Sequence, residues 1–215
     1  MNGFLICIVG IDGSGKTTLS NKVTDLLTQR NVRNKQIYLG WRNFDSAPFK
    51  MIATLIKKGS GGSFNAADNH RVTTQKIKHA GFFKFAVMVD YCLTTISRMF
   101  IPLLTRTTVV CDRYFFDVLI NTGVDLGESE QRICRSIYRW GHVFPKPALL
   151  ILLDVPVEVA YERKDDIPTV DYLTEHREIF LSLATKFGMI VLDGTRSSET
   201  LESVIRIKID ELLRN

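Results

Sequence analysis

Short apolar runs alternate along the chain with longer segments in which apolar residues recur at helical spacing. The runs predict five strands, at residues 4–9, 35–40, 107–112, 148–155 and 189–193. Most of these runs are apolar at nearly every position, which is typical of strands buried on both faces of a parallel sheet. The pattern predicts an α/β fold, a five-stranded parallel sheet with helices on both faces.

Apolar residues spaced three or four positions apart predict the helices. They are expected at residues 15–30, 47–58, 67–79, 82–104, 115–122, 128–142 and 198–213, with a short helix that has Pro156 in its first turn. The glycine-rich stretch at 59–63 is either a mobile functional loop or a plain connector. No internal repeat or long linker divides residues 1–215, so we expect a single domain.

The net charge of +5 and the pI near 9.0 fit either a nucleic-acid partner or a site for polyphosphates. The basic residues are scattered and form no nucleic-acid-binding motif, which favours a small-molecule site and no nucleic acid polymer. The apolar segment 81–104 is interrupted by Lys84, Asp90 and Arg98, so we interpret it as a core helix rather than a membrane span. The four cysteines lack metal-ligand spacing, as expected for reduced thiols in a cytoplasmic protein.

Residues 8–20 contain Gly10, Gly15, Lys16 and Thr17 at the spacing of a phosphate-binding P-loop. Glycines in such a loop let backbone amides surround phosphate oxygens, and the following helix points its positive end at the same anion. Lys16 is expected to reach the terminal phosphates, and the Thr17 hydroxyl to bind Mg²⁺. The loop therefore predicts binding of a nucleoside triphosphate.

Two predicted strands end in an aspartate that is a candidate carboxylate for a site beside the P-loop. Asp112 is followed by Arg113, a pair suited to a Mg²⁺-bound water and to a phosphate in transfer. Asp154 precedes Pro156 at the start of the short helix, and we assign it a structural role. Neither NK pair in the chain is followed by the aspartate of a guanine-reading motif, so we do not expect a regulatory GTPase.

Four blocks of sequence, "GIDGSGKTT", "VVCDRYFFD", "LLDVPVEVAYERK" and "LTEHREIFLSLA", resemble the thymidylate kinase family of P-loop nucleoside monophosphate kinases. The resemblance runs from residue 4 to about residue 213. It implies phosphoryl transfer from ATP with Mg²⁺. The residues that it implies for the donor phosphates are Gly13, Ser14, Gly15, Lys16, Thr17 and Thr18.

The resemblance also implies roles beside the donor phosphates. Asp12 would face the acceptor or its metal, and Arg113 would clamp phosphate between donor and acceptor. The candidate catalytic residues are then Lys16, Arg113, Asp112 and Asp12, and the candidate metal ligands are Thr17 and Asp112.

Other candidate residues lie in two segments outside the P-loop region. Arg42 in "GWRNF" would bind the acceptor phosphate. Residues 162–170 would form a lid in which Arg163 and Lys164 close over the transferring phosphate. Arg177 on the next helix would brace that lid. The alternative for Arg42, Arg163 and Lys164 is a solvated side chain without a ligand. A homodimer is also implied by the resemblance.

The acceptor is a nucleoside monophosphate, with dTMP as the first candidate, or else another small molecule or sugar. In the family an arginine on the long helix binds the nucleobase, and Tyr91 stands near that place. Tyr91, Phe82 or Phe85 could stack on a base, although an aromatic residue on a long helix is more often part of the core. A sugar hydroxyl would need a general base, for which Asp12 or Asp112 is available. A nucleotide-binding regulatory protein without any acceptor is a second alternative.

Overall fold

The computed structural model describes residues 3–40, 80–163 and 169–214, apart from the side chains of Ala80, Phe83 and Ser97. The predicted helices at 47–58 and 67–79 and the glycine-rich stretch at 59–63 lie outside these residues.

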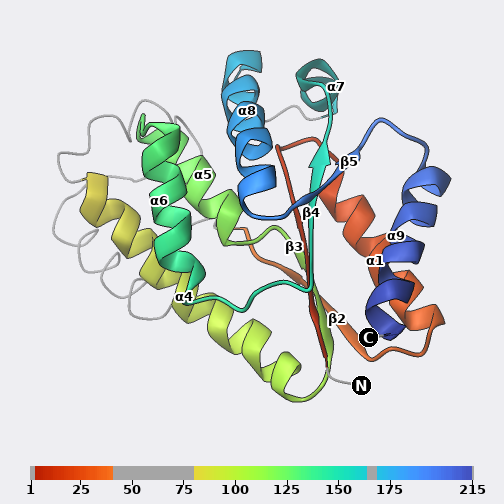
Figure 1. Cartoon of the computed structure of the whole chain (residues 1–215). Helices are drawn as coiled ribbons and strands as arrows, with labels where there is room; N and C mark the ends of the chain where they lie inside the picture. Colours follow the sequence, from red (N-terminus) through yellow and green to blue (C-terminus); the bar gives the residue numbers. More distant parts are fainter. Residues whose placement is uncertain (1–2, 41–79, 164–168, 215) are drawn as a thin grey trace, which may run out of the picture.

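The strands are β1 (Leu5–Val9), β2 (Asn34–Tyr38), β3 (Thr108–Asp112), β4 (Leu149–Asp154) and β5 (Ile190–Asp193). They form one parallel sheet in the order β2-β3-β1-β4-β5 (Figure 1). All five predicted strands are present, and the predicted α/β fold class is confirmed. β1 lies at the centre of the sheet, so the segment that follows it has neighbouring strands on both sides.

Burial of the strands follows their place in the sheet. The central strands β1 and β3 are buried at every position, and β4 at all but its last. The edge strands are more exposed: β2 has one buried residue, Ile37, and β5 alternates between half-buried and exposed residues. A continuous apolar run therefore marks the centre of this sheet, because only there does a strand have helices on both faces and a strand on each side.

The described helices are α1 (Lys16–Gln29), α4 (Ala80–Leu104), α5 (Phe115–Asp125), α6 (Glu130–Gly141), α7 (Val157–Glu162), α8 (Val170–Lys186) and α9 (Ser198–Arg214). Helices α1 and α9 cover one face of the sheet, while α4, α5 and α8 cover the other, with α6 packed on α5 (Figure 1). Successive residues of β1 serve opposite faces: Ile6 and Ile8 join the core under α1 and α9, and Cys7 joins the core under α4 and α5.

Helix α5 is longer than the sequence predicts. The predicted helix ends at residue 122, before Gly123, whereas the observed helix continues to Asp125. A Cβ atom on Gly123 would lie 2.5 Å from the side chain of Ile133 in α6. The glycine lowers the helix propensity of this turn, but it permits the close packing of α5 against α6, and this tertiary contact decides the outcome.

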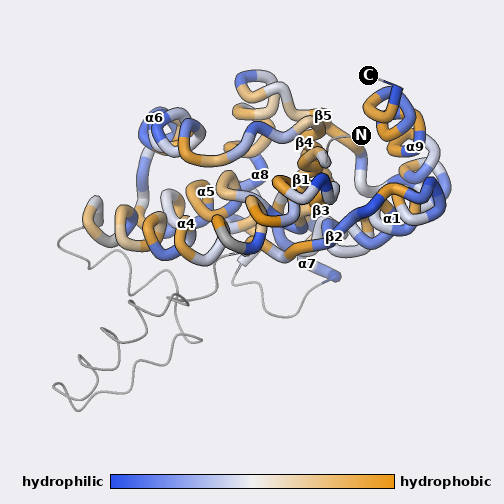
Figure 2. Tube along the Cα trace, turned by 90° about the horizontal axis from the view of Figure 1, so that it is seen from below, coloured by the Kyte–Doolittle hydropathy of each residue, from blue (hydrophilic) through white to orange (hydrophobic). Residues whose placement is uncertain are grey.

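Helix α4 is the most apolar helix of the described chain (Figure 2). Its segment Lys84–Leu104 is long and apolar enough to cross a membrane by length and composition, and 41% of the tested window is buried inside the protein. One side of the helix packs on β3 and α5 through residues such as Met88 and Met99. A core helix passes the same test, so composition alone does not make α4 a membrane span.

Candidate active site

The P-loop lies at the carboxyl edge of the sheet, where residues 10–15 connect β1 to α1 (Figure 1). In the register of the sheet, Ile8 is paired with Asp112 of β3 and with Ile151 of β4. The two aspartates that end β3 and β4 therefore lie on opposite sides of the loop. This edge is where parallel α/β sheets bind ligands.

Two glycines of the loop are required by its geometry. Gly13 has φ +81°, and a Cβ atom on it would lie 2.2 Å from the carbonyl oxygen of Ala160 in α7. Gly15 has φ +96° and caps the start of α1. A side chain at Gly13 would push the loop away from α7. The loop is thus fixed between the end of β1 and the short helix after β4.

Lys16 is buried at the base of the loop, with 5% of its surface exposed. Its Nζ donates hydrogen bonds to the carbonyl oxygens of Gly10, at 2.9 Å, and Ile11, at 2.6 Å. Burial and the nearby Arg113 lower the pKa of Lys16 to about 8, although neighbouring carboxylates such as Asp12 act in the opposite direction. The ammonium group is held inside the P-loop by these carbonyls, and its contact with the terminal phosphates stays a prediction.

Thr17 and Asp112 meet beside the loop. The Thr17 hydroxyl donates a hydrogen bond of 2.5 Å to Asp112 Oδ2. The other carboxylate oxygen, Asp112 Oδ1, is buried, and so is the Ser14 hydroxyl; neither has a hydrogen-bond partner in the described parts of the chain. A hydroxyl and a carboxylate are hard oxygen ligands of the kind that Mg²⁺ prefers. These residues fit the predicted Mg²⁺ and phosphate site.

Arg113 follows β3 in a left-handed backbone conformation, with φ +74°. Its backbone N–H donates to the carbonyl oxygen of Ile8 at 2.9 Å, so the residue remains attached to β1. Its Nη2 forms an ion pair with Asp12 Oδ1, and Asp12 in turn lies 3.9 Å from Lys16 Nζ. Two cations from different elements thus share one carboxylate of the P-loop. Such a backbone conformation costs energy in a residue other than glycine and is typical of functional sites.

A family model described as thymidylate kinase matches residues 64–205 of the chain. "Probable thymidylate kinase" of Metallosphaera sedula is 30% identical over 210 residues, which cover 93% of this chain and 89% of that protein. "Probable thymidylate kinase 1" of Saccharolobus solfataricus is 31% identical over 218 residues, which cover 94% of this chain and 95% of that protein. The chain belongs to the thymidylate kinase family. The resemblance drawn from the four sequence blocks is confirmed.

A bacterial member of the family is also similar over nearly the whole chain. "Thymidylate kinase" of Xylella fastidiosa is 24% identical over 218 residues, which cover 98% of this chain and 92% of that protein. The family likeness therefore includes the P-loop as well as the segment that the family model matches.

Asp117 is a charged residue of the site to which the sequence analysis assigned no role. It lies in the first turn of α5, with 1% of its surface exposed, and Oδ1 is 3.8 Å from Arg113 Nη1. Burial raises the pKa of Asp117 to about 6, against the lowering effects of Arg113, Lys16 and the Tyr114 N–H. Its spacing of four residues from Arg113 was visible in the sequence, but its burial was not.

Neighbouring carboxylates stabilise the positive charge of Arg113. Burial lowers the pKa of Arg113, but the carboxylates of Asp12 and Asp117 raise it further, so that the balance lies above the ordinary value for arginine. Its guanidinium carbon also lies 5.8 Å from the centre of the Tyr38 ring at the end of β2. Arg113 therefore stays cationic at any physiological pH.

Asp154, at the end of β4, has a different partner. Arg177 of α8 donates two hydrogen bonds to its carboxylate, from Nε at 2.6 Å and from Nη2 at 2.9 Å. This bidentate pair joins the end of β4 to α8, in keeping with the structural role that the sequence analysis gave to Asp154. The proposed lid contact of Arg177 remains a prediction, since residues 164–168 are outside the described chain.

Four of the predicted acceptor-site and lid residues come from outside the P-loop region. Arg42 and Lys164 lie outside the described residues, and Arg163 is exposed at the end of α7. Tyr91 is 2% exposed in the core beneath the sheet, with its ring 5.5 Å from that of Phe144. Its hydroxyl is buried and accepts or donates no hydrogen bond within the described chain.

Phe82 and Phe85 lie on the outer side of α4, where their surfaces are 74% and 56% exposed. The remaining donor residue, Thr18, is exposed on the first turn of α1 beside Thr17. The structure thus gathers the donor-site residues around the P-loop, together with Asp12 and Arg113, which are also predicted to face the acceptor. Tyr91 packs in the core, and Arg163 is exposed at the end of α7.

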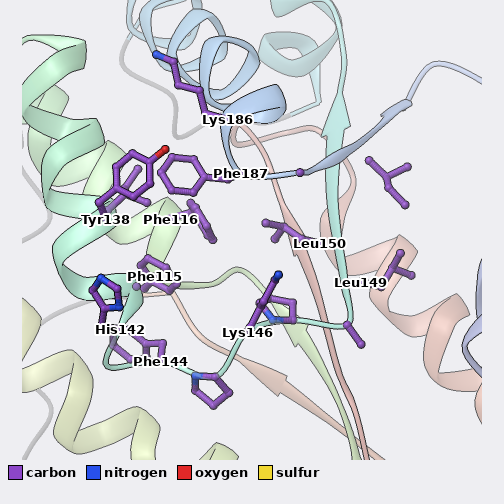
Figure 3. A pocket seen from close by; sticks show the side chains of 17 residues that line it. Phe115, Phe116, Tyr138, His142, Phe144, Lys146, Leu149, Leu150, Lys186 and Phe187 are labelled. Atoms are coloured by element: carbon purple, nitrogen blue, oxygen red, sulfur yellow. The ribbon is translucent and has the colours of Figure 1, made fainter. Parts of the chain in front are cut away.

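A separate cavity of about 760 Å³ lies among α5, α6, the end of α8 and the beginnings of β4 and β5 (Figure 3). Aromatic rings form much of its wall, among them Phe115, Phe116, Phe144 and Phe187. The amino ends of β4 and β5 border it, so it lies away from the carboxyl edge that carries the P-loop. No predicted site residue that the structure describes lines this cavity.

Proposed function

We propose that this chain is a nucleoside monophosphate kinase that transfers the γ-phosphoryl group of Mg·ATP to dTMP, giving dTDP and ADP. Membership of the thymidylate kinase family supports this reaction. The observation that carries it is that Lys16 and Arg113 both form ion pairs with the same carboxylate oxygen, Asp12 Oδ1. A P-loop that only binds a nucleotide has no need of a second cation beside it, whereas phosphoryl transfer does.

In the proposed reaction an oxygen of the dTMP phosphate bonds to the γ-phosphorus of ATP. The bond from that phosphorus to the β–γ bridging oxygen breaks, and ADP leaves. The acceptor phosphate is already ionised at neutral pH, so no general base is required. The protein's task is to align the two phosphates and to balance the charge on the transferring group.

The described residues divide this task. Backbone amides of the P-loop, with Ser14 and Thr18 beside them, would hold the donor phosphates, and Lys16 would neutralise their terminal charge. Mg²⁺ would be held by the Thr17 hydroxyl and, directly or through water, by Asp112; when bound it offsets phosphate charge. Asp12, which would face the acceptor, would give up its ion pair with Arg113. Arg113 would then contact the transferring phosphate.

The acceptor-site assignments extend this proposal. Arg42 would bind the dTMP phosphate, Arg163 and Lys164 of the lid would add positive charge, and Tyr91 would border the base. Replacing Arg42 by alanine is expected to raise the KM for dTMP at least about tenfold, because a charge-assisted contact is lost, without changing the KM for ATP. An equal rise in both constants would contradict a role specific to the acceptor.

A coupled assay of ADP release tests the function. The purified chain is supplied with Mg·ATP and, in separate reactions, with dTMP, other nucleoside monophosphates, and phosphorylated and free sugars. We expect stimulation by dTMP that disappears in the Lys16→Ala variant. Stimulation by another acceptor but not by dTMP would replace dTMP in the proposal. ATP turnover that no acceptor stimulates would contradict the proposed kinase activity.

The replacement of an arginine by Tyr91 supports a second candidate, transfer to another acceptor at the same site. Tyr91 cannot supply the positive charge and fork of an arginine to a base carbonyl, and its hydroxyl is buried. Both candidates predict the same dependence on Lys16, so the Lys16→Ala variant does not separate them. The panel of acceptors does.

We also propose a cytoplasmic homodimer that contains α4 in its interface. The four cysteines are free thiols, as suits a reducing compartment. Large apolar side chains are exposed along α4, a pattern typical of interfaces. They are Phe82, Phe85, Leu93, Ile96, Ile101 and Leu104.

Sedimentation of the purified chain tests this assembly. We expect a dimer that the Leu93→Glu and Ile96→Glu substitutions together convert to a monomer. The matched control is Ile207→Glu, at an apolar residue of α9 that is 58% exposed. A wild-type monomer at every concentration, or a control variant that dissociates equally, would contradict the proposed interface.

A further inference from the structure

Asp117 lies beneath Arg113, on the side away from solvent. Its Oδ2 accepts a hydrogen bond of 3.0 Å from the backbone N–H of Tyr114, at the start of α5. Its Oδ1 is buried, makes no hydrogen bond within the described chain, and is 3.8 Å from Arg113 Nη1. One oxygen thus fixes the carboxylate to the helix, and the other is directed at the guanidinium group.

Two carboxylates hold Arg113, and they differ in access. The side chain of Asp12 is 32% exposed and belongs to the phosphate-binding loop, whereas that of Asp117 is 2% exposed. A phosphate that approaches the loop can compete with Asp12 for Nη2 of Arg113. It does not displace Asp117 in the same way, because that carboxylate is almost entirely buried.

Arg113 also has an unused donor. Its Nε is buried and has no hydrogen-bond partner among the residues described. Nε–H lies on the same edge of the guanidinium plane as Nη2, the edge that Arg177 presents to Asp154. Nε and Nη2 can therefore both donate to a phosphate that displaces Asp12, while Nη1 on the opposite edge faces Asp117 Oδ1. Buried donors and acceptors are costly when unpaired, so Asp117 Oδ1 favours a closer approach of Nη1, and Nε favours a new acceptor such as a phosphate oxygen.

We propose that Asp117 is a positioning residue for Arg113: it remains as the counter-ion of the guanidinium group when phosphate displaces Asp12, and so fixes the Nε and Nη2 donors on the transferring phosphate. The inference rests on the proposed phosphoryl transfer and deepens it. Asp117 touches neither substrate and acts only through Arg113.

A double-mutant cycle tests this role. The variants are Asp117→Asn, which keeps the side-chain size and an acceptor for the Tyr114 N–H, Arg113→Ala, and the two together. We expect Asp117→Asn to lower kcat about tenfold or more, because a misplaced catalytic group is costly, with the KM for ATP changed less than about twofold. In the Arg113→Ala background the same substitution is expected to change kcat less than about twofold.

The matched control is Glu130→Gln. Glu130 is likewise an acidic residue in the first turn of a helix, α6, and is paired with a basic residue, Lys186, at 3.0 Å, but it lies away from the P-loop. We expect wild-type kinetics from this variant. Effects of Asp117→Asn and Arg113→Ala that multiply independently, or an Asp117→Asn enzyme with wild-type kcat, would overturn the positioning role.

A spectroscopic measurement separates failure of this inference from failure of the proposed reaction. In protein labelled with ¹⁵N-arginine, the Nε–H resonance of Arg113 is assigned by its loss in Arg113→Lys. With Mg·ADP and dTMP added, we expect slow solvent exchange of this proton in the wild type and fast exchange in Asp117→Asn. Equal exchange in both proteins would overturn the inference, whether or not dTMP is the acceptor that turns over.

Discussion

Replacing Asp117 by asparagine is expected to stabilise the folded chain at neutral pH while it impairs transfer. Burial raises the pKa of Asp117 from 3.8 to about 6, so the folded state favours the protonated side chain. Between about pH 4 and pH 6 the folded state binds more protons than the unfolded state. The stability contributed by this residue therefore falls as the pH rises through that window, and the full cost of the buried charge is present above it.

The size of the effect follows from the shift. About two pKa units correspond to roughly 3 kcal/mol of preference for the neutral form. An asparagine is neutral at every pH, so Asp117→Asn is expected to gain up to about 3 kcal/mol in the free energy of unfolding at pH 7.5 and nothing near pH 4. For a chain of this length such a gain raises the unfolding midpoint by roughly 6–12 °C.

Urea unfolding at a series of pH values from 5 to 8 measures this difference, with far-ultraviolet circular dichroism as the probe. Glu130→Gln is the control of opposite sign, since the Lys186 ammonium lowers the pKa of Glu130 and its carboxylate favours the folded state. An Asp117→Asn variant that is less stable than the wild type at pH 7.5, or a difference that is independent of pH, would show that the Arg113 ion pair outweighs the cost of burial.

Three further substitutions test the other groups. Lys16→Ala is expected to lower transfer at least about 100-fold in the coupled assay, because charge stabilisation is lost, without lowering the unfolding midpoint; more than about a tenth of wild-type activity would contradict the role. Arg113→Ala is expected to lower kcat more than it weakens ATP binding, and the reverse in a titration would make Arg113 a binding residue only. Arg177→Ala removes the partly exposed pair with Asp154 and is expected to cost about 1 kcal/mol of stability with little change in kcat; a large loss of kcat at unchanged stability would instead support its predicted contact with the lid.

The sheet could be predicted from the sequence because its central strands are buried on both faces. No polar residue interrupts β1, and β3 and β4 are interrupted only near their ends, so their apolar runs are unambiguous. The end of α5 could not be predicted in the same way. Gly123 weakens the local helical pattern, and only the contact with Ile133 of α6 shows why a glycine is required there.

The donor site could also be predicted from the sequence, because the P-loop spacing fixes Lys16 and Thr17 relative to the glycines. The meeting of Thr17 with Asp112 depends on the pairing of β1 with β3, which a parallel sheet with this connectivity supplies. Asp117 was not identified, because its role depends on burial and on the direction of the Arg113 side chain. Neither property can be read from a spacing of four residues.

The electrostatics of the site support a role for a buried carboxylate beside Arg113, the proposed catalytic arginine. In the structure Lys16 is bound by loop carbonyls and Arg113 by Asp12, so both cations already have partners. An incoming phosphate must replace those partners. The replacement is favourable only if each cation stays in the site when its former partner is displaced. Lys16 is held by two backbone carbonyls of the loop, which stay in place, whereas the guanidinium group of Arg113 is held by carboxylate side chains, one of which a phosphate would displace. Asp117 provides a second anchor from a position that is almost entirely buried.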